Sequence, residues 1–136
     1  MTSVDRYGRS QLHSAAVEDD IEQARSLLDR GANPNISDRQ GLTPLHLAAQ
    51  AQAARVASLL LERGASPNAA DRYGNTPLWT AVFNSRGAGI LIALLRAHGA
   101  DPYHRNQAGR TPVELARQIA NYPVASFFAD LPTDET

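Results

Sequence analysis

The sequence predicts an all-α solenoid in which four helix-turn-helix repeats, joined by short hairpin-like loops, stack side by side. Glycines recur at a nearly fixed spacing of 33, 33 and 35 residues, at positions 8, 41, 74 and 109. Apolar runs recur in register behind them, at Leu27-Leu28, Leu59-Leu60-Leu61, Leu94-Leu95 and Phe127-Phe128. A period of this length is typical of stacked repeats, because one short unit cannot bury its own apolar face without its neighbours.

The first helix of each repeat is expected to begin just behind the repeat glycine. Three of these starts carry a Thr-Pro pair, at Thr43-Pro44, Thr76-Pro77 and Thr111-Pro112, and the first repeat has Ser10 without the proline. A Ser or Thr hydroxyl caps free backbone N–H groups, and a proline at the next position loses no hydrogen bond and has its φ preset for a helix. The sequence therefore predicts a capped helix start in all four repeats.

The second helix of each repeat carries the recurring apolar run and is expected to end at a glycine. Gly31, Gly64 and Gly99 follow these runs, and prolines stand three residues further on, at positions 34, 67 and 102. Glycine suits the residue after a helix because φ is often positive there, and the proline prevents the helix from resuming. In the fourth repeat the second helix is expected to be short and to begin near Pro123.

These strings resemble the ankyrin repeat, whose T-P-L-H-x-A signature is matched in full by Thr43-Pro44-Leu45-His46-Leu47-Ala48 and in large part by the other three strings. The resemblance covers the chain from Asp5 to Phe128. It implies an ankyrin-repeat domain over residues 1–128, with repeats at about 5–37, 38–70, 71–105 and 106–128. Residues 129–136 form an acidic tail with no further repeat to pack on, so we expect this tail to fray.

Composition narrows the classes of function. The 136 residues include 13 basic and 14 acidic side chains, so the net charge of −1 produces no strong field that would attract nucleic acid or an anionic membrane. The amino terminus lacks an apolar run behind a basic stretch, and the most apolar segment, residues 90–95, is too short to span a bilayer. We therefore expect a cytoplasmic protein, monomeric when alone, that binds neither nucleic acid nor membrane.

The sequence predicts neither an enzyme nor a metal or cofactor site. Cysteine and lysine are absent, which excludes thiolate nucleophiles, Cys-ligated metals and Schiff-base chemistry. His13 and His46 occupy the same position of successive repeats and are expected to bond to neighbouring backbone or hydroxyl groups, whereas His98 and His104 lack metal-ligand spacing. The acidic cluster at 18–22 lacks the spacing and the glycine of a Ca²⁺-binding loop and is expected to cap a helix instead.

The ankyrin resemblance implies that a protein partner binds the loop tips between repeats and the exposed side of the first helices. The tips at 5–7, 38–40 and 71–73 are rich in Arg and Tyr, which often anchor interfaces. Candidate partner contacts are therefore Tyr7, Arg39 and Tyr73. The alternative is ordinary turn chemistry, with tip arginines that only pair with a neighbouring aspartate.

Repeat three departs most from the others. Trp79 replaces the histidine, and two extra residues lie between the two expected helices, beside Phe83, Asn84 and Arg86. Surface loops tolerate insertion at little cost, and this one places side chains suited to recognition beside the single tryptophan. All four residues are therefore candidate partner contacts. The alternative is that Trp79 and Phe83, four apart on one helix face, pack between repeats, and for Phe83 we favour this alternative.

The stretches 77–89, 111–116 and 119–128 also resemble a group of short bacterial ankyrin proteins that are encoded beside polymorphic toxins. That resemblance implies an immunity protein, which would bind its cognate toxin or effector and cover or distort the active site. Similar small ankyrin proteins serve as adaptors or scaffold subunits, so a general interaction module is the second hypothesis.

Overall fold

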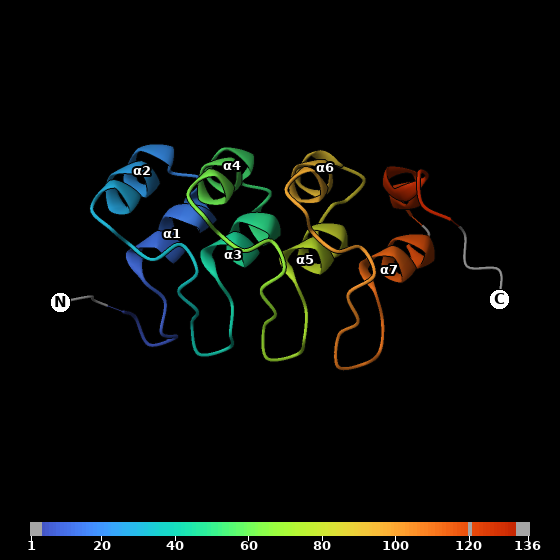
Figure 1. Cartoon of the computed structure of the whole chain (residues 1–136), viewed down its shortest axis with the longest axis horizontal. Coiled ribbons are helices and arrows are strands. Elements are labelled where there is room, and N and C mark those ends of the chain that lie inside the picture. Colours follow the sequence, from blue (N-terminus) through green and yellow to red (C-terminus); the bar gives the residue numbers. More distant parts are fainter. Residues whose placement is uncertain (1–3, 120, 133–136) are drawn as a thin grey trace.

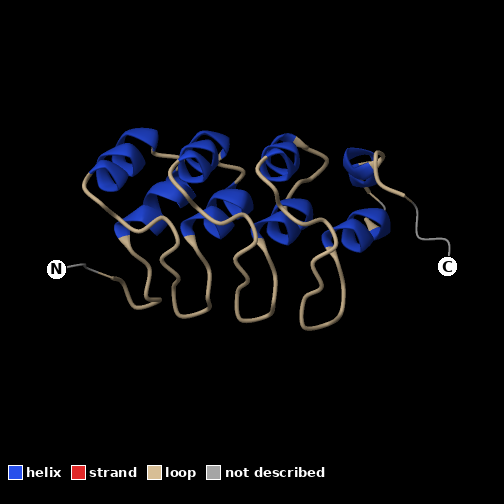
Figure 2. Cartoon of the chain, in the orientation of Figure 1, coloured by secondary structure: helices blue, strands red, loops and turns tan. Residues whose placement is uncertain are grey.

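The computed structural model describes residues 4–119 and 121–132, which form helices and loops without a β-strand (Figure 1, Figure 2). Three repeats contain a first and a second α-helix, namely α1 (Gln11–Glu18) with α2 (Ile21–Asp29), α3 (Pro44–Ala51) with α4 (Ala54–Glu62), and α5 (Pro77–Phe83) with α6 (Ile90–Ala97). The fourth repeat pairs α7 (Pro112–Gln118) with a short 3₁₀ helix, η1 (Val124–Phe128). The predicted all-α solenoid of helix-turn-helix repeats is confirmed.

The helices form two layers with the core between them. In Figure 1 the first helices α1, α3, α5 and α7 follow one another in the lower row, α2, α4 and α6 lie in the row above, and long loops hang side by side below. Leucines from both layers are completely buried, and Phe128, in η1 of the last repeat, closes the core at that end with 1% exposure. No helix within the described residues has the length and apolarity needed to cross a membrane.

Helix capping follows the sequence prediction in three of the four repeats. The Ser10 and Thr43 hydroxyls accept the backbone N–H groups of His13 and His46 at 3.4 and 3.3 Å. In return, the Nδ1 atoms of these two histidines accept the backbone N–H groups of the two cap residues at 3.0 and 3.1 Å. Thr111 forms the same reciprocal box with Glu114, so each of these helix starts satisfies two backbone donors.

The prediction of a capped helix start is wrong for repeat three, because Thr76 begins α5 without a side-chain cap hydrogen bond. Trp79 stands where the other repeats have His or Glu, and an indole offers an N–H donor but no acceptor for the Thr76 backbone N–H. The Thr76 Oγ1 atom is buried and has no hydrogen-bond partner among the described residues. The Thr-Pro pair therefore predicts where the helix starts but not how the start is capped.

His13 and His46 link successive repeats, which confirms the structural role expected for them. Their Nε2 atoms lie 2.8 Å from the carbonyl oxygens of Leu42 and Asn75, one repeat further along the chain. Because a carbonyl can only accept, Nε2 carries the proton and Nδ1 is left as the acceptor for the cap residue. Both rings are therefore neutral, and burial lowers the pKa of both histidines from the usual 6.5.

These lowered pKa values make stability depend on pH. Unfolding returns both histidines to ordinary pKa values, so below about pH 6.5 the unfolded chain binds more protons than the folded chain. We expect the free energy of unfolding, measured by urea denaturation, to be highest above pH 6.5 and to fall as the pH drops below it. In His46→Gln the fall should be smaller, and equal stability of the parent at pH 7.5 and 5.5 would contradict the assignment of neutral buried rings.

The loop tips dock on one another through backbone hydrogen bonds. Arg39 N donates to Tyr7 O, Arg72 N to Gln40 O, and Gln107 N to Tyr73 O, at 2.9 to 3.0 Å. This close approach requires glycine at the turn, because a Cβ on Gly74 would lie 2.9 Å from the Gln107 nitrogen. Gly109 adopts the same backbone conformation, with φ of +76° against +79° at Gly74, but a Cβ there would meet nothing within 4 Å.

We expect Gly74→Ala to lower the free energy of unfolding by about 2–3 kcal/mol, and Gly109→Ala by only about 1 kcal/mol. Both variants force an L residue to positive φ, whereas only Gly74→Ala also pushes the next tip away. Thermal or urea unfolding of the two variants makes the comparison. Equal losses would mean that tip docking does not contribute to stability.

The chain continues past η1 along α6. Arg96 makes two 2.8 Å hydrogen bonds to the Asp130 carboxylate and donates to the Phe127 carbonyl at 3.0 Å, and this pairing holds the pKa of Asp130 below its usual 3.8. Leu131 packs against the core. Fraying of the tail at 129–136 stays a prediction, since residues 129–132 lie in the described part with the contacts given above and 133–136 lie outside it.

Candidate protein-binding surface

The connection between the two helices of repeat three is longer than its counterparts. Six residues, 84–89, separate α5 from α6, whereas two residues join the helices of repeat one and of repeat two. The two inserted residues account for part of this difference, and α5 and α6 are each one residue shorter than the corresponding helices of repeat two. The predicted longer surface loop is therefore present.

This loop rests on the C-terminal segment of the chain. A Cβ at Gly87 would meet the Tyr122 ring at 3.2 Å, and one at Gly89 would overlap the Phe127 ring at 2.3 Å. Arg86 turns the chain with φ of 49° and is exposed, with no hydrogen bond or ion pair to a described residue. The loop backbone therefore packs on Tyr122 and Phe127, while the Arg86 side chain extends into solvent.

Phe83 does not pack between repeats, so the interpretation we favoured for it is wrong. Its side chain is 67% exposed at the C-terminal end of α5. Val17 and Gln50, at the same place in the first two repeats, are exposed as well. This face of the first helices is therefore exposed to solvent in all three repeats. Four-residue spacing on a helix places Phe83 beside Trp79 but does not decide which of the two is covered.

Two hollows flank Phe83. One, of about 360 Å³, runs along α5 and is lined by Gln50, Asn75, Trp79, Thr80, Phe83 and Asn84. The other, of about 310 Å³, lies between α5, the 84–89 loop and the last repeat, and its lining includes Val82, Phe83, Arg86, Leu115, Ile119 and Tyr122. The structure thus brings all four repeat-three candidates to one surface, with Phe83 shared by both hollows.

Trp79 both packs against repeat four and borders a surface hollow. The ring is partly buried, and the guanidinium carbon of Arg110 lies 5.9 Å from the ring centroid, so the indole joins repeat three to repeat four. The same ring lines the first hollow, where a partner could reach it. Replacement of Trp79 would therefore change stability as well as binding.

Asn84 is tied to the framework more than it is offered to a partner. Its side-chain Nδ2 donates to the Thr80 carbonyl at 2.9 Å and so ends α5. Its own carbonyl accepts Gln52 Nε2 at 3.3 Å, a contact between repeats two and three. Asn84 lines the first hollow, but mainly as part of its wall.

The three tip candidates lie along a separate edge, in the loops that precede the first helices. Tyr7 and Tyr73 are 53% and 52% exposed, and Arg39 is exposed. The alternative, in which Arg6 or Arg72 pairs with the aspartate of a neighbouring tip, is not seen among the described residues; the arginine that makes such a pair is Arg9, just behind the first tip, whose Nε lies 3.2 Å from Asp38 Oδ2. The hollow along α5 begins at Asn75 beside the third tip, so the edge and the repeat-three surface are continuous.

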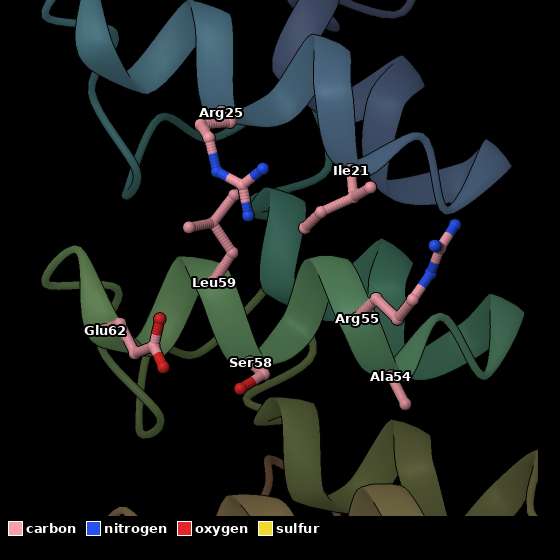
Figure 3. A pocket seen from close by; sticks show the side chains of 7 residues that line it. All are labelled: Ile21, Arg25, Ala54, Arg55, Ser58, Leu59 and Glu62. Carbon is pink, nitrogen blue, oxygen red and sulfur yellow. The ribbon is translucent and has the colours of Figure 1, made fainter.

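A further hollow on the outer face was not expected from the sequence. It measures about 450 Å³ and lies between α2 and α4, lined by Ile21, Arg25, Ala54, Arg55, Ser58, Leu59 and Glu62 (Figure 3). Its arginines are already engaged, because Arg25 lies 3.8 Å from Glu22 and Arg55 lies 3.5 Å from Asp19. Sequence reasoning also missed Tyr122 and Arg110, whose roles depend on how the last repeat packs.

The remaining histidines, His98 and His104, lie at the end of α6 and in the loop that follows it. His104 Nε2 lies 3.2 Å from the Gly74 carbonyl, and His98 is exposed at the end of α6. Within residues 4–119 and 121–132, no group of three His, Asp or Glu side chains is placed to hold a metal ion.

Comparison with known proteins agrees with this architecture. The family model for ankyrin repeats (three copies) matches residues 12–106, which is most of the chain. No curated protein matches the chain. The matched region begins at the second residue of α1 and extends through α6, and it includes the docked tips at 38–42 and 71–75. The chain therefore belongs to the ankyrin-repeat family, whose repeats indicate a protein-protein interaction module.

Proposed function

We propose that this chain is a bacterial immunity protein that binds one cognate toxin or effector and neutralises it. The observation that carries the proposal is Phe83, a large apolar side chain that is 67% exposed between two hollows. An aromatic ring flanked by hollows suits a partner that inserts side chains on both sides of it. The similarity of residues 77–89, 111–116 and 119–128 to immunity-type ankyrin proteins adds support.

In this proposal the partner centres on Phe83 and reaches both the Trp79 ring and the Arg86 guanidinium. Apolar burial around Phe83 would supply most of the affinity, and Arg86 would add a directional, charge-assisted contact. A partner held there could have its active site covered by the flanking repeats. Such a protein would act in the bacterial cytoplasm, as a monomer until it meets its partner, because a toxin-producing cell must be protected from within.

The experiment is a growth test with the gene encoded next to this one. We expect expression of the neighbouring protein alone to arrest growth of a heterologous bacterial host, and co-expression with this chain to restore it. Phe83→Asp should abolish the rescue, since a charge at the centre of the contact must be desolvated. Ser58→Asp is the matched control, because it places the same charge in the outer hollow between α2 and α4 and should still rescue.

The other outcomes separate the two hypotheses. Rescue by Phe83→Asp would mean that the repeat-three surface is not the inhibitory site. A harmless neighbour, together with affinity capture from the native host that recovers several unrelated partners, would favour the general adaptor or scaffold role instead.

A further inference from the structure

Charge is distributed unevenly along the chain. The four tip loops, residues 5–9, 38–42, 71–75 and 106–110, contain five arginines and three aspartates. The rest of the chain contains eight arginines and eleven acidic residues. The protein is therefore polarised, with a basic edge at the tips below the first helices and an acidic excess elsewhere (Figure 1).

The tip aspartates each accept hydrogen bonds from backbone N–H groups of their own loop. One oxygen of Asp5 accepts the backbone N–H groups of Tyr7 and Arg9 at 2.8 and 3.0 Å, and Asp71 and Asp38 do the same in their own loops. Asp38 is only 8% exposed and also binds Arg9. Asn106 makes the same turn bonds in the fourth tip without any charge.

Three tip arginines extend into solvent. Arg6, Arg39 and Arg72 are exposed, and no carboxylate of a described residue lies within ion-pair distance of them. Tyrosines support two of the three, because Arg6 lies 5.4 Å from the Tyr7 ring centroid and Arg72 lies 4.9 Å from that of Tyr73. Arg72 also donates to the Tyr73 hydroxyl at 2.7 Å.

Three arginines on the outer face of the protein, in or just after α2 and α4, pair with carboxylates. Arg25, Arg55 and Arg63 lie 3.8, 3.5 and 2.8 Å from the carboxylates of Glu22, Asp19 and Asp29. These three arginines are thus paired with carboxylates, whereas Arg6, Arg39 and Arg72, one in each of the first three tips, are not. The contrast is not complete, because Arg9 and Arg105 pair with Asp38 and Glu114, and Arg30, which follows α2, is exposed without a carboxylate partner among the described residues.

We propose that the tip row, defined as Arg6, Tyr7, Arg39, Arg72 and Tyr73, binds a carboxylate-rich segment of a protein partner. An arginine presents a planar fork that pairs with a carboxylate through two parallel hydrogen bonds, and a guanidinium held by a tyrosine loses less freedom on binding. Backbone bonds between neighbouring tips hold the three arginines in one row. The proposal rests on protein binding by the repeats and not on the identity of a toxin.

A nucleic acid fits this edge less well. Guanidinium groups lie over both tyrosine rings, 5.4 Å from the Tyr7 centroid and 4.9 Å from the Tyr73 centroid, and so compete with bases for stacking on them. The acidic excess on the rest of the chain repels phosphates. A short acidic segment would need only the tip row.

The test uses a fluorescein-labelled peptide of twelve glutamates as the probe, with twelve lysines and the oligonucleotide dT12 as comparisons. We expect the glutamate peptide to bind most tightly at low salt, with NMR shifts of the backbone amides concentrated in the tip loops. The variant Arg6→Gln/Arg39→Gln/Arg72→Gln should lose affinity at least about tenfold. Its matched control, Arg25→Gln/Arg55→Gln/Arg63→Gln, removes the same charge from the outer face and should bind like the parent.

Three results would overturn the proposal. Equal losses in the two triple variants would show that only net charge matters. Binding of dT12 as tight as that of the glutamate peptide would identify a phosphate-binding edge, and absence of glutamate-peptide binding would remove the assigned ligand. Thermal unfolding of both variants checks that each is folded. None of these results depends on whether the neighbouring gene encodes a toxin.

Discussion

Replacing His46 by Ala is expected to lower the free energy of unfolding by about 3–5 kcal/mol, a large share of the stability of a small domain. His46 is completely buried, so truncation leaves a cavity between repeats two and three. It also removes the acceptor for the Thr43 N–H and the donor for the Asn75 carbonyl. Unpaired polar groups in a dry interface add their desolvation penalty to the loss of packing.

Urea denaturation of His46→Ala beside His98→Ala measures this effect. His98 is exposed at the end of α6, so its removal should change stability by no more than about 0.5 kcal/mol. Comparable small losses in both variants would show that the histidine link between repeats does not hold the solenoid together.

Replacing Phe83 by Ala is expected to weaken partner binding by about 2 kcal/mol, or roughly 30-fold in Kd, while stability stays nearly unchanged. The ring is mostly exposed in the free protein, so the folded chain loses little packing when it is removed. In the complex the ring would be covered from both hollows, so its loss affects only the bound state. Isothermal titration calorimetry with the purified partner gives the affinity.

Val17→Ala serves as the control for Phe83→Ala. Val17 occupies the same helix position in repeat one and is 48% exposed, but it lines neither of the two hollows that flank Phe83. It should bind almost like the parent. A Phe83→Ala variant that binds as tightly as the parent would remove repeat three from the recognition surface, whatever the partner is.

The repeat architecture could be predicted because it depends on short-range rules. A Thr-Pro pair starts a helix, and a glycine with φ near +93° follows α2, α4 and α6, at Gly31, Gly64 and Gly99. The roles of His13 and His46 could also be predicted, because a residue that recurs at one place in successive repeats faces the same neighbours each time.

The surface could be predicted only in part, because exposure depends on what packs alongside. The two extra residues indicated a longer loop in repeat three, but not that Tyr122 and Phe127 would support it from the last repeat. Spacing alone favoured packing for Phe83, which is exposed. Substitution of Trp79 for histidine was visible in the sequence. Only the structure shows that the Thr76 hydroxyl has no hydrogen-bond partner among the described residues.

The most direct test of the central claim, that the repeat-three surface binds one protein partner, is hydrogen exchange by mass spectrometry on this chain with and without the protein encoded beside it. Light scattering on the same sample should show a one-to-one complex. We predict slower exchange over residues 73–90, around Phe83 and the 84–89 loop, with α2 and α4 unchanged. No complex, or protection confined to the outer hollow between α2 and α4, would contradict the account.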